Sequence, residues 1–244
     1  MSEDSDIAHQ FDAGGWEFTS HVAEVFDDHV RASVPFYDAI QDLVAETTDW
    51  LVPAGGLVAD LGASTGASAL RILQRHPGRG IRFALYDEQP AMLDQARLAI
   101  DELGGHEVTF NVTRIQEAPL AHADADLTLA LFTLQFLPQQ ERLDALRLAR
   151  AYSKEMGALI VAEKIRPVDG RWAEIGQDVA HDYKAAHGIS DSAIRAKARA
   201  LRGVLRPAPQ QTTMQTITAA GWHSPEVLFR WHSWAVIGAF ASAQ

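Results

Sequence analysis

The residues with the clearest chemical meaning are the glycines and acids in and after the segment Asp60-Leu-Gly-Ala-Ser-Thr-Gly66. Glycine lets a backbone approach a ligand closely, and the unpaired N–H groups at the start of the helix that follows attract polar or anionic groups. Asp87 lies at the end of the next predicted strand, where a carboxylate can accept hydrogen bonds from a ribose diol. This pattern predicts a site for a nucleotide-like ligand.

Two common nucleotide motifs do not fit this turn. A phosphate-binding P-loop is excluded because no Gly-Lys-Ser/Thr follows. The dinucleotide pattern G-x-G-x-x-G also fails, since Ser64 occupies the second glycine position and Ala67 follows Gly66. Asp87 does not discriminate by itself, because NAD enzymes place an acid at the same point. The structural alternative is that the glycines serve only a tight turn between a strand and a helix.

The elements that must position these residues alternate between strand and helix, which is typical of a parallel, doubly wound α/β sheet. Two closely spaced final strands fit a hairpin, so the last strand is expected to enter the sheet antiparallel. The predicted fold is therefore a Rossmann-like sheet of six parallel strands and one antiparallel strand. The expected strands are 57–61, 81–86, 108–112, 127–132, 158–162, 226–230 and 233–240, and the expected helices between them are 67–74, 90–103 and 139–152.

We expect one domain over residues 1–244 rather than two independent ones. In this division, residues 1–52 form a helical cap and residues 53–164 form the cofactor-binding half. Residues 165–244 form a helical insertion followed by the terminal hairpin.

Composition limits the classes of function. The chain has 244 residues, 47% of them hydrophobic and 22% charged, which is typical of a soluble globular enzyme. It has no cysteine, which excludes disulfides, thiolate zinc sites and cysteine nucleophiles, and none of its ten histidines has the H-x-x-x-H spacing of a metal site. We therefore expect no metal.

Charge and hydropathy limit location and partners. The net charge of −11 argues against direct binding to nucleic acid. The apolar stretches are far shorter than the roughly 20 residues that cross a bilayer, and the acidic first ten residues are unlike a signal peptide. The expected partners are a small molecule and no membrane, and the expected location is the cytoplasm.

Several stretches resemble motifs of known proteins. DLGASTG, YDEQPAML and FTLQFL resemble motifs of the class I S-adenosylmethionine (SAM)-dependent methyltransferases. VAEVFDDHVRASVPFY, LFTLQFLPQQER and HDYKAAHGIS are similar to the carboxy-SAM synthases, which make carboxy-SAM from SAM and prephenate for modification of a tRNA wobble uridine. The resemblance implies SAM or carboxy-SAM as ligand, and a homodimer with residues 172–205 near its interface.

The resemblance also implies roles for particular residues. Tyr37 is expected to cover the ligand, and Asp87, with Glu88 beside it, to bind the ribose hydroxyls. Arg114 and Ile115 are expected to flank the adenine. Gly62, Ala63 and Ser64 are expected to contact the methionine part, and the whole expected cofactor set is Tyr37, Asp60, Gly62, Ala63, Ser64, Gly66, Asp87, Glu88, Arg114, Ile115 and Leu131.

The chain departs from the carboxy-SAM synthase pattern at two positions. Ala198 stands where the family has the arginine that pairs with the added carboxylate, and Leu131 stands where it has an asparagine. An unpaired carboxylate in a dry pocket is unfavourable by several kcal/mol, so the missing arginine matters. Arg195, Arg199 and Arg202 lie near Ala198 on the same predicted helix and are candidates to bind an anion, or else they form a solvated helix face.

Three functions remain open from the sequence. The leading one is methyl transfer from SAM to a small acceptor, which needs positioning more than a dedicated catalytic residue. The second is carboxy-SAM synthesis from SAM and prephenate, with an arginine near Ala198 replacing the lost cation. The third is a SAM-binding protein without turnover.

Overall fold

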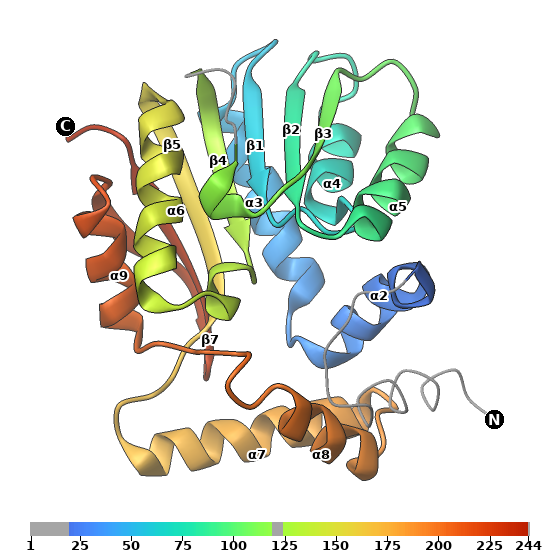
Figure 1. Cartoon of the computed structure of the whole chain (residues 1–244), viewed down its shortest axis with the longest axis vertical. Coiled ribbons are helices and arrows are strands. Elements are labelled where there is room, and N and C mark those ends of the chain that lie inside the picture. The colour runs from blue at the N-terminus through green and yellow to red at the C-terminus, as the bar shows by residue number, and fades with distance from the viewer. Residues whose placement is uncertain (1–19, 119–123, 244) are drawn as a thin grey trace.

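The computed structural model of the chain describes residues 20–118 and 124–243. A seven-stranded sheet of order β3-β2-β1-β4-β5-β7-β6 forms its centre (Figure 1). The strands are β1 (Leu57–Leu61), β2 (Arg82–Asp87), β3 (Val108–Val112), β4 (Ala125–Leu131), β5 (Ser153–Lys164), β6 (His223–Trp231) and β7 (Trp234–Phe240). The helices are α2 (Ser20–Ser33), α3 (Tyr37–Leu51), α4 (Ala67–Arg75), α5 (Pro90–Asp101), α6 (Gln139–Tyr152), α7 (Gly170–Ala186), α8 (Asp191–Ala200) and α9 (Gln210–Ala219), with short 3-10 helices η1 (Ile115–Glu117) and η2 (Leu134–Phe136).

The central strands are buried on both faces, as continuous apolar strands of a parallel sheet must be. Every residue of β1 and of β4 is buried. One apolar core joins the sheet to α3, α4 and α5, and a second core joins its other face to α6 and α9. The result is a three-layer sandwich, and the predicted fold class is confirmed.

The direction of the last strands follows the prediction. β7 pairs antiparallel with β5 and with β6, whereas β1 to β5 pair in parallel with one another. Six strands therefore run one way and β7 runs the other. The described boundaries differ most at β5, which begins at Ser153 rather than at residue 158 because Ser153 pairs with Ala125 before an irregularity in the ladder.

Three helices lie beyond the sheet and not against its faces. Figure 1 shows α7 and α8 crossing below the lower end of the sheet, with α2 beside them. Contacts of α2 with α5 and with α7 join this helical group to the sandwich. The carboxyl ends of the parallel strands point toward these helices, so a ligand at that edge is covered by them. Within the described residues, no helix is long and apolar enough to cross a membrane.

Candidate functional site

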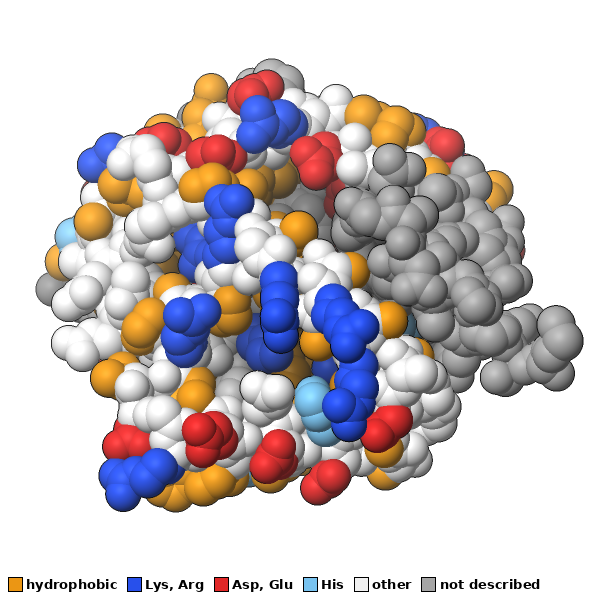
Figure 2. Space-filling model, turned by 60° about the horizontal axis from the view of Figure 1, so that its bottom comes forward, with side chains coloured by type: hydrophobic (Ala, Val, Ile, Leu, Met, Phe, Trp, Pro, Cys, Tyr) orange, Lys and Arg blue, Asp and Glu red, His pale blue; other side chains and the backbone are white. Residues whose placement is uncertain are grey.

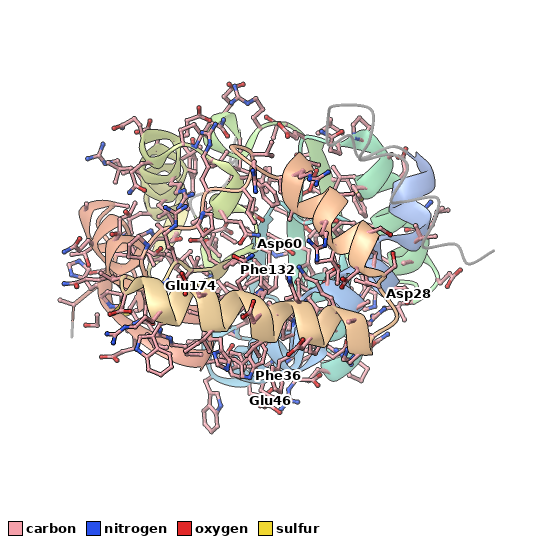
Figure 3. The ribbon with its side chains drawn as sticks, turned by 90° about the horizontal axis from the view of Figure 1, so that it is seen from below. Asp28, Phe36, Glu46, Asp60, Phe132 and Glu174 are labelled. Carbon is pink, nitrogen blue, oxygen red and sulfur yellow. The ribbon has the colours of Figure 1, made fainter. Side chains whose placement is uncertain are left out.

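A large cavity lies between the carboxyl ends of the strands and the helices α2, α7 and α8. Its volume is about 1050 Å³, the upper end of the roughly 300–1,000 Å³ typical of ligand sites. Seen from below, Asp60 and Phe132 lie together near the centre of the molecule, next to α7, which crosses the view (Figure 3). Both residues line the cavity. The cavity is therefore at the strand edge where the sequence predicted a ligand.

The turn after β1 brings its backbone to the cavity wall. Gly62 has φ 80° and Gly66 has φ 77°, a conformation that side chains rarely adopt, and Ser64 shares it with φ 51°. A Cβ atom on Gly62 would overlap the side chain of Thr133, and one on Gly66 would lie 2.9 Å from Ala96 Cβ. Gly62 thus permits a close approach at the cavity. Gly66 permits packing of α4 on α5 and is not among the described residues that line the cavity.

Asp87 connects the two motifs on either side of β2. Its carboxylate oxygens accept hydrogen bonds from the backbone N–H of Ser64 and from that of Gln89, each 2.9 Å long. Burial raises the pKa of Asp87, and these N–H donors oppose that rise. Asp87 therefore fixes the glycine turn from within and also lines the cavity, with Glu88 beside it.

Asp60 is the most buried acid of the cavity, with 2% of its surface exposed. Burial, with a smaller contribution from the charge of Asp87, raises its pKa to about 7. Two carboxyl groups so near each other in a dry site cannot both ionise easily. A cationic ligand group would stabilise the charged form of both. Together with Glu88 and Glu141, these acids line what we call the acidic half of the cavity.

The residues expected at the rim of the cofactor site also reach the cavity. The ring of Tyr37 is buried at the start of α3 and lies 6.0 Å from that of Phe132, centroid to centroid. Arg114 donates to Glu117 and to Glu141, each at 3.1 Å, and is held beside Ile115 of η1. The expected residues that line the cavity are Tyr37, Asp60, Gly62, Ala63, Ser64, Asp87, Glu88, Arg114, Ile115 and Leu131.

The opposite side of the cavity, formed by α2, β5, α7, α8 and the segments after β5 and α8, is lined by basic side chains. Figure 2 looks onto this end of the molecule and shows Lys and Arg side chains gathered around a hollow. The basic residues that line it are His29, Lys164, Arg166, His181, Lys184, Lys197, Arg202 and Arg206, and we call this side the basic half.

The anion-binding candidates near Ala198 separate in the structure. Arg202 and Ala198 line the cavity, whereas Arg195 and Arg199 are not among the described residues that do. Arg195 is exposed and lies 3.7 Å from Asp191 on its own helix. Sequence reasoning missed Lys164 and Lys184, and it included Lys197 only in a run of cations that could form either an anion site or a solvated helix face. The sequence held one signal for this site. Lys164 closes a strand at the ligand edge, and it is one of only four lysines in the chain.

Two polar residues follow or close the strands at this edge, Gln135 in η2 after β4 and Glu163 near the end of β5. Gln135 accepts the backbone N–H of Lys164 at 2.7 Å and donates to the carbonyl of Phe132 at 3.0 Å. Glu163 is buried behind the cavity, with 1% of its surface exposed, and burial raises its pKa to about 7. Gln135 therefore joins η2 to the end of β5, whereas Oε1 of Glu163 has no hydrogen-bond partner among the described residues.

Arg142 of α6 holds the segment that closes the basic half. Its guanidinium donates to the carbonyls of Leu137, Gln135 and Arg206. The backbone N–H of Arg206 in turn donates to the carbonyl of Gln135 at 2.7 Å. Because Arg206 lies in the segment after α8, the buried Arg142 fixes part of the cavity wall to the core.

Within the described residues, no group of three or more His, Asp or Glu side chains could hold a metal ion.

Comparisons with known proteins agree with this geometry. A family profile described as "Methyltransferase domain" matches residues 58–157. The carboxy-S-adenosyl-L-methionine synthase of Erwinia tasmaniensis is 32% identical over 218 residues, which cover 89% of this chain and 88% of that protein. The protein of the same name from Yersinia pestis is 30% identical over 217 residues, covering 89% of this chain and 81% of the relative.

Solved structures share the fold. An O-methyltransferase family protein from Burkholderia thailandensis matches with a TM-score of 0.64 at 18% identity, over 96% of this chain and 62% of that longer one. Magnesium protoporphyrin IX methyltransferase from Synechocystis, with bound SAH, matches with a TM-score of 0.57 at 14% identity, over 98% of this chain and 94% of the other.

The sheet order, the glycine turn and Asp87 define a SAM-dependent transferase with the class I methyltransferase fold. SAM is its cofactor. Within this class the chain belongs to the carboxy-SAM synthase family, as its near full-length similarity to the Erwinia and Yersinia proteins shows.

Proposed function

We propose that the protein transfers the methyl group of SAM to a small-molecule acceptor held in the basic half of the cavity. The observation that carries this proposal is the division of one cavity into an acidic half, at the glycine turn, and a basic half formed by α2, β5, α7 and α8. The cavity volume of about 1050 Å³ leaves room for a second molecule beside a nucleoside-sized ligand.

The acidic half fits the cofactor. We assign the ribose hydroxyls to Asp87 and Glu88, the methionine part to Gly62, Ala63 and Ser64, and the adenine to Arg114 and Ile115. The close approach permitted at Gly62, the buried carboxyl of Asp60 and the half-buried carboxyl of Asp87 support this assignment. Asp60, Leu131 and the ring of Tyr37 complete the lining around it.

Bound SAM supplies an electrophilic methyl carbon that is bonded to its positively charged sulfur. The protein's part is to orient the acceptor in line with that carbon and to exclude water. Fixed geometry of this kind lowers a barrier without a dedicated acid or base. Arg142, through the wall segment that it binds, keeps the acceptor side of the cavity in place.

Carboxy-SAM synthesis is the second candidate, and the names of the most similar curated relatives favour it. Ala198 removes the expected cation, but Lys197 of the same helix and Lys184 of α7 line the cavity near it. These lysines, rather than Arg195 or Arg199, are the residues we assign to a ligand carboxylate, with Arg202 at the rim.

Weighing the ligand that the purified protein retains separates the two candidates. SAM or its demethylated product alone, with methyl transfer to an acceptor in a screen, supports the leading proposal. Carboxy-SAM, heavier by one carbon dioxide, together with prephenate-dependent formation from SAM, supports the second. Failure to form any product from SAM with prephenate or any acceptor would favour a SAM-binding protein without turnover.

We further propose that the three segments 1–52, 53–164 and 165–244 act as one domain around this cavity; residues 1–19 lie outside the described part. The resemblance supports a homodimer with residues 172–205 near the interface, where Trp172 is 63% exposed. Native mass spectrometry tests the dimer.

We also propose a cytoplasmic location and no direct contact with nucleic acid. The net charge of −11 is consistent with both.

A further inference from the structure

The wall of the acidic half contains a junction between two elements that are distant in the sequence, η1 and α6. Glu141 in the first turn of α6 accepts hydrogen bonds from Arg114 and from Gln116, and these two residues stand on either side of Ile115. The distances to the Glu141 carboxylate are 3.1 Å from Arg114 Nη2 and 2.7 Å from Gln116 Nε2. All four residues line the cavity. The junction is therefore part of the ligand site as well as a contact between two elements.

Both donors use the same oxygen of the Glu141 carboxylate. Oε2 accepts the two hydrogen bonds, whereas Oε1 has no hydrogen-bond partner among the described residues. The side chain of Glu141 is 35% exposed, and Oε1 is not one of the buried atoms that lack a partner, so this atom is accessible. The carboxylate is thus held in position through one oxygen and has the other available to a ligand.

The order of the strand ends indicates which part of the cofactor this junction meets. We assign the methionine part to the turn after β1 and the ribose to Asp87 at the end of β2. β3 pairs with β2 up to Val112, and the backbone N–H of Thr113 donates to the carbonyl of Asp87 at 2.9 Å. The third part of the cofactor, the adenine, therefore lies toward the segment after β3, where Arg114 begins the junction with Glu141.

The hydrogen-bonding groups of the junction suit one edge of adenine. Adenine presents a 6-amino group, which is a donor, beside a ring nitrogen that accepts. The guanidinium of Arg114 has donors only, so it cannot accept a hydrogen bond from that amino group, whereas a carboxylate such as that of Glu141 has acceptors. A base with a 6-oxo group would instead bring a second acceptor to Oε1 and leave Oε1 without a donor.

We propose that Oε1 of Glu141 accepts a hydrogen bond from the 6-amino group of the cofactor's base and thereby selects an adenine nucleoside over its 6-oxo analogue. Arg114 and Gln116 are positioning residues, because they hold the carboxylate without contacting the amino group. This inference rests on the proposed placement of the adenine beside Arg114 and Ile115. It applies equally to methyl transfer and to carboxy-SAM synthesis, since both begin from SAM.

Two ligands that differ only in the base test the assignment. S-adenosylhomocysteine and its deaminated analogue S-inosylhomocysteine have the same ribose and the same amino-acid part, and each is titrated calorimetrically into the full chain. The analogue loses a hydrogen bond to a charged group, so we expect the wild-type chain to bind it about 10- to 100-fold more weakly. Glu141→Gln should bring the two affinities to within about threefold of each other, because its amide nitrogen can replace Oε1 and donate to a 6-oxo group.

A matched control separates the carboxylate at the base from the other acid of the junction. Glu117 also accepts from Arg114, at 3.1 Å, but it is exposed and is not among the described residues that line the cavity. Glu117→Gln should leave both affinities unchanged. Both variants replace a solvent-accessible acid by an amide of the same shape, so they are expected to fold, and urea unfolding checks this. If Glu141→Gln does not fold, Glu141→Asp decides, because it withdraws the carboxylate by one methylene and should also narrow the ratio of affinities.

The positioning role of Arg114 has a readout of its own. Arg114→Met leaves Glu141 held by Gln116 alone, so the preference for the 6-amino base should fall by about two- to fivefold, as expected for a partly exposed ion pair. Arg114→Lys keeps a donor for Glu141 and should restore most of the preference. A role in stability alone would lower the free energy of unfolding of Arg114→Met without changing the ratio of affinities.

Each contrary result has a distinct meaning. Equal affinities of the wild-type chain for the two ligands, or a ratio that Glu141→Gln leaves unchanged, overturn the inference, while the proposed function stands. A ratio that behaves as expected, without methyl transfer to any acceptor, contradicts the proposed function and leaves the inference in place. A chain that binds neither ligand overturns both, because the acidic half then does not hold the cofactor.

Discussion

The two halves of the cavity carry side chains of opposite charge, and these side chains are held in different ways. In the acidic half, Asp87 is held by backbone N–H groups of the turn and of α5, so its position is set by secondary structure alone. In the basic half, Lys184 and Lys197 come from two helices outside the sheet, and their proton affinities are lowered by burial and by one another. One half presents carboxyls, of which that of Asp60 is fully buried, and the other presents half-buried amines.

This difference separates the binding groups that the fold itself supplies from those that depend on individual side chains. The acidic half uses strand ends and a glycine turn that any protein of this fold possesses, so it suits a ligand shared by the whole class. The basic half depends on a few long side chains from α7 and α8, which can change without disturbing the sheet. We therefore expect substitutions in the acidic half to abolish cofactor binding, and substitutions in the basic half to change the substrate.

The largest effect should come from Asp87→Ala. It removes the carboxylate that we assign to the ribose and also leaves two backbone N–H groups without their acceptor. Charge-assisted hydrogen bonds contribute about 1.5–3 kcal/mol each, so the affinity for SAM should fall by roughly 100-fold or more. Calorimetric titration with SAM measures this. Asp94→Ala, an exposed acid on α5, is the control. Equal affinities in the two variants would remove Asp87 from the site.

Comparing Gly62→Ala with Gly78→Ala separates two costs of a side chain at the turn: the overlap with a neighbouring residue and the positive φ. Gly78 has nearly the same φ, 81° against 80°, but no atom lies within 4 Å of a Cβ built there. A positive φ is unfavourable by about 1–2 kcal/mol in both alanine variants. Only Gly62→Ala also overlaps Thr133, so its free energy of unfolding should fall by about 2 kcal/mol more. Urea unfolding measures both variants, and equal losses would show that Thr133 moves aside freely.

The pH dependence of stability tests the buried carboxyl of Asp60. Its folded pKa of about 7 lies above the unfolded value, so the group contributes stability that is present below pH 4 and is lost as the pH rises through 7. Asp60→Asn should remove this contribution to the fall in the protein without ligand. Unfolding free energies between pH 4 and pH 8 measure it. Glu163, whose pKa is also about 7, adds a similar slope that Asp60→Asn leaves intact. An unchanged slope would mean that Asp60 ionises normally.

The smallest effect is expected at the rim of the basic half. Arg202 lines the cavity but is exposed to solvent, where a single cation contributes less than about 1 kcal/mol. Arg202→Gln should therefore raise the KM for the acceptor only two- to fivefold, with SAM binding unchanged. Arg199→Gln, outside the cavity lining, should change neither. An effect at Arg202 larger than tenfold would place the acceptor toward the rim of the cavity.

The sequence predicted the acidic half well because local rules create it. A buried apolar strand, a glycine turn and an acid after the next strand lie close together in any parallel sheet, so the turn at Gly62 and the place of Asp87 were predicted from spacing, whereas the role of Ser64 came from the resemblance. The ends of β5 were less predictable, because the pairing of Ser153 with Ala125 depends on a distant strand.

The basic half was predicted only in part, as a run of cations near the predicted pocket, because its composition depends on how helices are oriented. A run of cations on α8 does not reveal which side faces a cavity, and the candidates Arg195 and Arg199 are on another side from Lys197. The convergence of Lys164 and Lys184 with it arises from packing between α7, α8 and the sheet edge, which leaves no pattern in the linear chain.

Three of the four lysines of the chain line the cavity, and the fourth, Lys154, is bound to Asp126 at 2.7 Å. Outside the cavity, the surface thus offers one lysine side chain, Lys154, which is 41% exposed and paired with Asp126. Cross-linkers directed at amines will report poorly on contacts between copies of this protein. The same reagents become probes of the interior: loss of labelling at Lys184 on adding a ligand would locate that ligand by mass spectrometry, without any activity assay.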